Sequence, residues 1–190
     1  FRTPLSYGAV RTPTAQWTAT AAGACLVRAP GGQGVPVLSV TFGRVQDFAV
    51  HDINNMGAAM MPAAASTLLR YFSATGTSPQ DFDAIFTGDL GEVGTALLHE
   101  QMAKEGLPLD NHKDCGCLLY DTNSQNVQAG GSGAGCSAAV LCGKILPMLA
   151  AGQLRRVLFL ATGALMSQTT FLQGESIPGI AHCVELGGAV

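Results

Sequence analysis

Charged side chains are scarce in this sequence: Asp, Glu, Lys and Arg make up 12% of its 190 residues, against about 25% in typical globular proteins. The ten Lys and Arg residues are scattered and the net charge is -3, so the chain lacks the basic patch that nucleic-acid binding requires. Hydrophobic residues make up 47%, which suits an α/β domain with a sizeable core. With so few charges, part of the apolar surface is expected to meet a partner.

Signal and membrane-spanning segments are also missing. Residues 1–9 have neither the basic start nor the apolar run of a signal peptide. No window reaches the roughly 18 consecutive apolar residues of a membrane span. A soluble chain with at most peripheral membrane contact is therefore expected. The sequence starts at Phe1, without Met and in a polar loop, as expected of a piece of a longer protein.

The chain does not need disulfides, although it contains six cysteines. It is rich in Val, Leu, Ile and Ala, which build a core without covalent cross-links. Most of the cysteines lie inside apolar runs, and Cys142 and Cys183 are expected in the core. Buried, reduced thiols of a cytoplasmic protein are therefore favoured over disulfides.

Hydrophobic periodicity predicts alternating strands and helices. The predicted strands are residues 17–28, 35–47, 82–86, 156–162 and 182–186. The predicted helices are one that begins near Pro62, because proline is tolerated only in a first turn, and residues 91–105 and 136–151. Ser78 and Pro79 mark a short capped turn, and residues 110–113 a loop. This order predicts an α/β fold whose mostly parallel or mixed sheet is covered on both faces.

A glycine-rich stretch, AGGSGAGCSA at residues 129–138, precedes the third predicted helix. It lacks the third glycine of a dinucleotide fingerprint, the Gly-Lys-Ser/Thr of a P-loop, and the second glycine of a nucleophile elbow around Ser132. Two interpretations remain. The glycines expose N–H groups at a helix start, where a carboxylate or phosphate oxygen binds, or they let the backbone pack closely against a neighbour.

A second loop of the same kind, TGDLG at residues 87–91, joins a short strand to a helix. Both loops are expected at the carboxyl ends of strands, where open α/β sheets bind ligands. Asp89 and Glu92 are candidates for an acid and base pair or for a cation site. Acidic residues are also usual in a first helical turn, and capping is the favoured interpretation.

Other candidate groups have weaker patterns. The spacing of His112, Cys115 and Cys117 lacks a fourth ligand, so no zinc site is expected. Cys136 stands at a helix start but has no identifiable base beside it, as a nucleophile would need. Among the histidines, His182 is expected to be a hydrogen-bonded core residue, and His51 and His99 to be surface residues.

The longest motifs resemble those of the stage V sporulation protein AD family, which has a thiolase-like fold. The matching stretches are NNMGAAMMPAAA (54–65), DFDAIFTGDLGEVG (81–94), DCGCLLYD (114–121), AGGSGAGCSA (129–138), ATGALMS (161–167) and ESIPGIAH (175–182). The resemblance implies that residues 1–32 end an N-terminal half. Residues 33–190 are then the C-terminal half, a mixed five-stranded sheet flanked by helices within a layered α-β-α-β-α protein.

The resemblance also implies that the chain is not an enzyme. Condensing enzymes of the thiolase-like fold supply a histidine and an asparagine from this half. By resemblance those positions fall at Gly88 and near Gly131, where neither residue type is present. Without them nothing stabilises a thioester oxyanion on this side of the site. The half that carries the cysteine nucleophile is outside this chain.

The function implied by the resemblance is binding of dipicolinic acid and its calcium-linked uptake into the developing spore. The protein would act with small membrane proteins of the same stage V complex, peripherally on the inner spore membrane, without a cofactor other than calcium carried with dipicolinate. No metal site of the chain's own is implied. An apolar wall of Ala164 and Leu165 is expected beside the candidate ligand-binding residues, which are Gly88, Asp89, Gly131, Ser132, Met166, Ser167 and His182.

Two other functions stay open. One is an acyl-transferring relative with a rearranged site that uses Asp89 or His182; the other is a scaffold whose pocket is vestigial. In every case one half of such a fold is expected to expose apolar surface. The chain is therefore expected to pair with the missing N-terminal half or with copies of itself.

Overall fold

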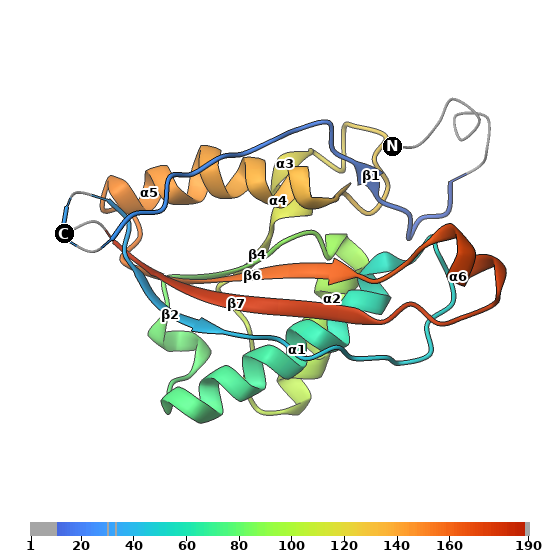
Figure 1. The fold of residues 1–190 in the computed structure, drawn as a ribbon, viewed down its shortest axis with the longest axis horizontal. Coiled ribbons are helices and arrows are strands. Elements are labelled where there is room, and N and C mark those ends of the chain that lie inside the picture. The colour runs from blue at the N-terminus through green and yellow to red at the C-terminus, as the bar shows by residue number, and fades with distance from the viewer. Residues whose placement is uncertain (1–10, 30, 33, 189–190) are drawn as a thin grey trace.

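A five-stranded sheet lies between two helical layers in the computed structural model, which describes residues 11–29, 31–32 and 34–188 (Figure 1). The strand order is β2-β7-β6-β3-β4. Three strands are successively antiparallel: β2 (Val37–Thr41), β7 (Gly179–Gly187) and β6 (Arg156–Ala164). The other two, β3 (Ala84–Thr87) and β4 (His112–Asp114), run parallel to β6. The predicted α/β class and mixed five-stranded sheet are confirmed.

One face of the sheet is covered by α1 (Met56–Thr75) and α2 (Gly91–Lys104) (Figure 1). The prediction that α1 begins near Pro62 is wrong, since Pro62 lies buried inside the helix. Asn55 caps the earlier start, because its side chain accepts a hydrogen bond from the Ala58 N–H at 3.2 Å. Burial of the proline ring in the core offsets the backbone hydrogen bond that it cannot donate.

The other face carries α3 (Cys115–Leu119), α4 (Ala134–Val140) and α5 (Leu146–Ala150). A π-helical turn, η3 (Leu141–Ile145), joins α4 to α5, so the helix predicted at 136–151 is confirmed with one irregular turn. Pro147 explains the turn, because it has no N–H for the Gly143 carbonyl. The Leu146 N–H instead reaches back to the Leu141 carbonyl.

The predicted strand at 17–28 is mostly wrong. Only β1 (Trp17–Thr18) forms, and it pairs with the equally short β5 (Gly131–Ser132). Residues 19–29 instead run extended over α4 at van der Waals distance from its backbone. A Cβ on Gly135 would lie 2.2 Å from the Ala21 carbonyl oxygen, and a Cβ on Gly23 would lie 2.3 Å from that of Ala138. Small side chains suit this close approach, and they look like a strand only in composition.

Most of the remaining predicted strands and helices form, with somewhat different bounds, and the structure contains two further helices. The predicted strands at 82–86, 156–162 and 182–186 and the helix at 91–105 form as β3, β6, β7 and α2, and the strand at 35–47 shortens to β2. The capped turn at Pro79 is the 3₁₀ turn η2 (Pro79–Asp81). The loop predicted at residues 110–113 is partly wrong, because His112 and Lys113 belong to β4, and the sequence patterns do not predict α3 and α6 (Gln168–Leu172). No helix of the described ranges is long and apolar enough to span a membrane.

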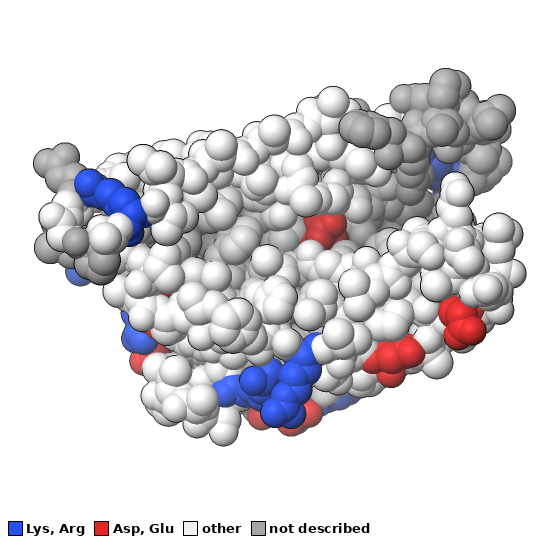
Figure 2. All heavy atoms as spheres, in the orientation of Figure 1, with Lys and Arg blue, Asp and Glu red and all other residues white. Residues whose placement is uncertain are grey.

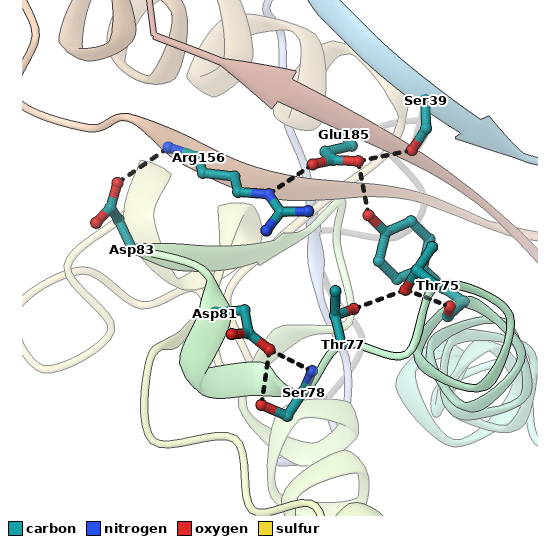
Figure 3. A network of polar contacts seen from close by, with 9 residues as sticks. Ser39, Thr75, Thr77, Ser78, Asp81, Asp83, Arg156 and Glu185 are labelled. Carbon is teal, nitrogen blue, oxygen red and sulfur yellow. Dashed lines mark hydrogen bonds and ion pairs between the residues drawn. The ribbon is translucent and has the colours of Figure 1, made fainter.

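A buried charge ties the edge strand β2 to the rest of the sheet (Figure 3). Glu185 in β7 accepts hydrogen bonds from Ser39 of β2 at 2.8 Å and from the Tyr71 hydroxyl of α1 at 2.7 Å. It also pairs with the Arg156 Nε of β6 at 2.7 Å. Burial alone would raise the pKa of Glu185, but these partners together lower it. Burial and the contact with Glu185 raise the pKa of Tyr71 to about 12.

Candidate functional site

The loop after β3 and the loop before α4 meet at the carboxyl end of β6. Asp89 joins them: its Oδ2 accepts the Gly133 N–H at 2.6 Å, and its Oδ1 accepts the Thr162 hydroxyl at 2.9 Å. The Ser132 hydroxyl lies at the hydrogen-bond limit, 3.5 Å from Oδ2. Asp89 therefore does not cap α2, the helix that follows it in sequence, as the favoured interpretation had it. It occupies the N-terminus of α4 instead.

Asp114, which no sequence motif singles out, caps α2. The Leu90 and Gly91 N–H groups donate to its carboxylate at 2.8 and 2.9 Å, and the Thr87 hydroxyl donates at 2.6 Å. The Gly116 N–H donates at 2.9 Å, so the same side chain also caps α3. Burial raises the pKa of Asp114, and the hydrogen bonds from Thr87, Gly91 and Leu90 oppose that rise. Asp114 thus shapes the loop that carries Asp89.

Gln16 connects the same two loops from the N-terminal segment. Its Nε2 donates to the Asp89 carbonyl oxygen at 2.7 Å and to the Gly131 carbonyl oxygen at 2.8 Å. The side chain is buried, and its Oε1 is without a hydrogen-bond partner among the described residues. Both loops are therefore held by amide and carboxylate groups from outside them, which fixes their relative position.

Four of the seven predicted ligand-binding residues come together at this junction: Gly88, Asp89, Gly131 and Ser132. The two glycines are closely packed. A Cβ on Gly88 would lie 2.8 Å from the Thr162 hydroxyl oxygen, and a Cβ on Gly131 would lie 3.0 Å from the Cys136 sulfur. The two interpretations of the glycine-rich stretch, exposed N–H groups at a helix start and close packing of the backbone, each apply to part of it. Gly131 allows close packing, and Gly133 offers its N–H to a carboxylate, which belongs to the protein itself.

The other three predicted residues lie elsewhere. His182 in β7 pairs with Ala161 of β6, and its Nδ1 accepts the Gly43 N–H at 3.0 Å. It is hydrogen-bonded, as predicted, but it lies at the sheet surface rather than in the core. Met166 is exposed, and Ser167 caps α6. Within the described part of the chain, no hydrogen bond links Met166 or Ser167 to the Asp89 junction.

A hollow opens on the face of the sheet that carries α4 and α5 (Figure 2). Its surface is almost free of charged side chains, apart from acidic atoms at its floor. Asp89 is 7% exposed, and burial raises the pKa of its carboxyl against the opposing hydrogen bonds from Gly133 and Thr162. No ion pair of Asp89 is found among the described residues, so backbone N–H and hydroxyl dipoles alone compensate its charge.

The thiols near the junction are poor nucleophiles. Cys136 is buried against Gly131, and its burial raises its pKa to about 12. Burial likewise raises the pKa of Cys117 to about 12. The motif of His112, Cys115 and Cys117 brings no metal site with it, because no group of three metal-binding side chains forms among the described residues. A thiolate at pH 7 is unfavourable at both cysteines.

A chain of hydrogen bonds runs from the surface to Asp114. The exposed His99 meets His112 at 3.0 Å between Nε2 and Nδ1. The Nε2 of His112 lies 2.9 Å from the Thr87 hydroxyl, which donates to Asp114. His112 therefore donates from Nε2 to that hydroxyl. Burial, with a smaller contribution from His99, lowers its pKa to about 3.

Replacing His112 with glutamine is expected to make the protein less sensitive to acid. Because the folded-state pKa of His112 lies below its unfolded value of about 6.5, the unfolded state binds the proton first. Stability is therefore complete above about pH 6.5 and falls as the pH decreases toward the folded-state pKa, by about 3 kcal/mol at pH 4.5 for the wild type. The His112→Gln substitution is expected to remove this loss. Urea unfolding at pH 6.5 and at pH 4.5 measures the free energy of unfolding of both proteins.

The exposed histidine His51 provides the control for this experiment. His51→Gln is expected to keep the pH dependence of the wild type. Equal pH dependence of the His112→Gln variant and the wild type would contradict the burial of a neutral imidazole at His112.

The chain is an α/β protein. Where its two strand-to-helix loops meet, the Gly133 N–H at the start of α4 is already bound by the protein's own Asp89 carboxylate. A family model described as Stage V sporulation protein AD (SpoVAD) matches residues 1–187. The chain belongs to this family. It is 42% identical over 193 aligned residues to Stage V sporulation protein AD of Bacillus subtilis (strain 168), covering 100% of the chain and 56% of that relative. The chain thus spans about half the length of its curated relative.

One solved structure among the matches is AbyA1, a tetronic acid condensing enzyme. The match has a TM-score of 0.46 and 17% sequence identity, and it covers 81% of this chain and 47% of the other.

Proposed function

We propose that the protein containing this chain binds dipicolinic acid without catalysing acyl transfer, and so supports calcium-linked uptake of that acid into the developing spore. Membership of the sporulation protein family supports a role in the spore. The observation that carries the non-catalytic part is the packing at Gly88 and Gly131. At both positions even a methyl group would press on a neighbour, so neither the imidazole nor the amide of a thiolase-like condensing enzyme fits there.

The alternative acyl-transfer chemistry has little support at the candidate residues. Asp89 holds Gly133 and Thr162 with its two carboxylate oxygens, so both oxygens already stabilise the junction as hydrogen-bond acceptors. His182 uses its Nδ1 to accept the Gly43 N–H, and its partner across the sheet is Ala161 rather than a nucleophile or a carboxylate. These contacts are structural, and they favour binding over catalysis.

The negative charge of Asp89 at the junction is the reason for including calcium in the proposal. Dipicolinate carries two carboxylates, and the Gly133 N–H that would receive one of them is already bonded to Asp89. A dianion beside the Asp89 carboxylate, whose charge no ion pair of the described residues neutralises, is repelled unless a cation lies between them. Calcium prefers carboxylate oxygens. We therefore propose that dipicolinate enters as its calcium complex, with the cation facing Asp89.

The exposed apolar surface supports a partner on the same face. Leu38 and Val40 of β2 and the following Phe42 are 53%, 51% and 76% exposed, on the strand that forms one edge of the sheet. Contiguous surface of this kind is unusual on a free domain. We propose that the remainder of the longer family protein covers it and completes the ligand site. Contact with the small stage V membrane proteins, peripherally at the inner spore membrane, is part of the same proposal.

Calorimetry on the full-length protein and on the 190-residue chain tests these proposals. The full-length protein is expected to bind dipicolinate when calcium is present and much more weakly without it. The isolated 190-residue chain is expected not to bind dipicolinate in either condition. Asp89→Asn removes the charge that faces the cation, and is expected to weaken binding of the calcium complex by about tenfold, which corresponds to about 1.4 kcal/mol. Circular dichroism confirms that the variant is folded.

The control for the calorimetry is Glu92→Gln, which removes an exposed charge close to Asp89 in sequence. It is expected to leave binding unchanged. Absence of dipicolinate binding by the full-length protein, with and without calcium, would favour the scaffold with a vestigial pocket. Turnover of an acyl-coenzyme A that is lost in Asp89→Asn would favour the acyl-transfer enzyme.

A further inference from the structure

Two of the six cysteines, Cys25 and Cys142, lie beside each other and are not fully buried. Cys115, Cys136 and Cys183 are buried in the two cores. Cys25 is exposed, and Cys142, which the sequence analysis had expected in the core, is partly exposed. The prediction of buried thiols is therefore correct for the three buried cysteines and wrong for Cys25; Cys117, like Cys142, is only partly buried. The side chains of Cys25 and Cys142 are also neighbours, since the nearby Cys25 thiol contributes to the raised pKa of Cys142.

The backbone around the two thiols is already in close contact. Cys25 belongs to the extended segment 19–29, and Cys142 belongs to the π-helical turn η3. An ideal Cβ on Gly23, two residues before Cys25, would lie 3.0 Å from the Cys142 sulfur and 2.3 Å from the Ala138 carbonyl oxygen. The segment therefore lies directly on the helix, as the short span of a disulfide requires.

Among the described residues, backbone hydrogen bonds hold only the start of the segment. Its start is fixed by the Ala19 N–H, which donates to the Ser132 carbonyl oxygen at 3.0 Å. From residue 20 to residue 29 the described chain forms no backbone hydrogen bond to the rest of the protein. The segment also carries Leu26 and Val27, which are 92% and 82% exposed. A covalent bond at Cys25 would therefore fix the position of two apolar side chains.

We propose that Cys25 and Cys142 are a reversible disulfide site that fastens segment 19–29 to the helix formed by α4, η3 and α5. The oxidant is a low-molecular-weight disulfide. The Cys25 thiolate attacks one of its sulfurs and forms a mixed disulfide, and the first small thiolate leaves. Cys142 then loses its proton to solvent and attacks the Cys25 sulfur, which releases the second small thiolate. The two protein thiols are oxidised by two electrons, and one small disulfide is reduced to two thiols.

The roles of the two cysteines follow from their exposure. Cys25 is the one that a dissolved disulfide reaches without any movement of the chain. Cys142 is less exposed, and burial followed by the neighbouring Cys25 raises its pKa, so little of it is thiolate at neutral pH. It acts second, on a mixed disulfide already beside it. The buried thiols of Cys115, Cys136 and Cys183 are inaccessible to the same reagent.

Mass spectrometry of the full-length protein treated with oxidised glutathione tests the proposal. After alkylation of free thiols and digestion, a peptide pair cross-linked between Cys25 and Cys142 is expected, about 2 Da lighter than the two free thiols together. Cys25→Ser is expected to abolish the cross-link, and Cys142→Ser to leave glutathione trapped on Cys25. Cys183→Ala, in a buried cysteine away from the pair, is expected to keep the cross-link.

Limited trypsin digestion tests whether the bond fastens the segment. Cleavage after Arg28, which lies in the exposed segment, is expected to slow in the oxidised protein and to recover after reduction. The Cys142→Ser variant is expected to show no such change. Independent glutathionylation of both cysteines without a cross-link would overturn the proposal, as would a cross-link that joins either of them to another cysteine of the chain. Equal cleavage rates in both redox states would overturn the fastening role.

Discussion

Replacing Asp114 with asparagine is expected to destabilise the protein by about 3 kcal/mol. The carboxylate accepts only, and its donors are the Thr87 hydroxyl and the N–H groups of Leu90, Gly91 and Gly116. An asparagine amide of the same size turns one acceptor into a donor, which then faces donors of the protein in a site closed to water. The starts of α2 and α3 lose their cap together. Urea denaturation at pH 7 measures the change.

Asp110→Asn is the matched control, because Asp110 lies on the same connection but is exposed. It is expected to change stability by less than about 0.5 kcal/mol. A similarly small effect at Asp114 would show that its hydrogen bonds are replaced by water, and would contradict the role assigned to it in shaping the Asp89 loop. Loss of dipicolinate binding in Asp114→Asn, with the fold retained, would support that role.

The second large effect is expected for Gly57→Ala, with a loss of about 3 kcal/mol. Gly57 in the first turn of α1 lies against the start of α2. A Cβ there would be 2.4 Å from the Leu90 carbonyl oxygen and 2.8 Å from the Gly94 nitrogen. Both are backbone atoms, so no side-chain rotation relieves the contact. The two helices must separate, and the melting temperature is expected to fall.

Gly143→Ala is the control for this substitution. Gly143 also lies in a helical segment, and a Cβ there meets nothing within 4 Å. The change is expected to stabilise the protein slightly, by up to about 1 kcal/mol, because alanine favours helix over glycine. If Gly57→Ala also left the melting temperature unchanged or raised it, the close approach of α1 to the Asp89 loop would not be as described.

The strongly apolar parts of the fold could be predicted from the sequence, and the polar connections could not. Residues 156–162 and 182–186 form continuous or alternating apolar runs, and they are strands. By contrast β4 has only the three residues His112–Asp114, all polar, and it forms because it pairs with β3. Pairing of this kind depends on a distant segment, and no local pattern carries it.

The candidate site shows the same division. The glycine pattern and the acidic residue after β3 located the junction, because both lie at strand-to-helix turns. The roles of the carboxylates were not predictable locally. Asp89 caps the distant helix α4, and Asp114 caps α2 from a strand that follows it in sequence. One signal was present for Asp114, since it directly precedes α3 in a position typical of a capping residue.

The two carboxylates at the junction are solvated by the protein's own backbone. N–H groups of Gly133 around Asp89, and of Leu90, Gly91 and Gly116 around Asp114, take the places that water or counter-ions would otherwise fill. Mobile ions screen such short, buried contacts weakly. The shape of both loops is therefore insulated from changes in ionic strength and in water activity, while the exposed pair of Lys104 and Glu100 remains subject to both.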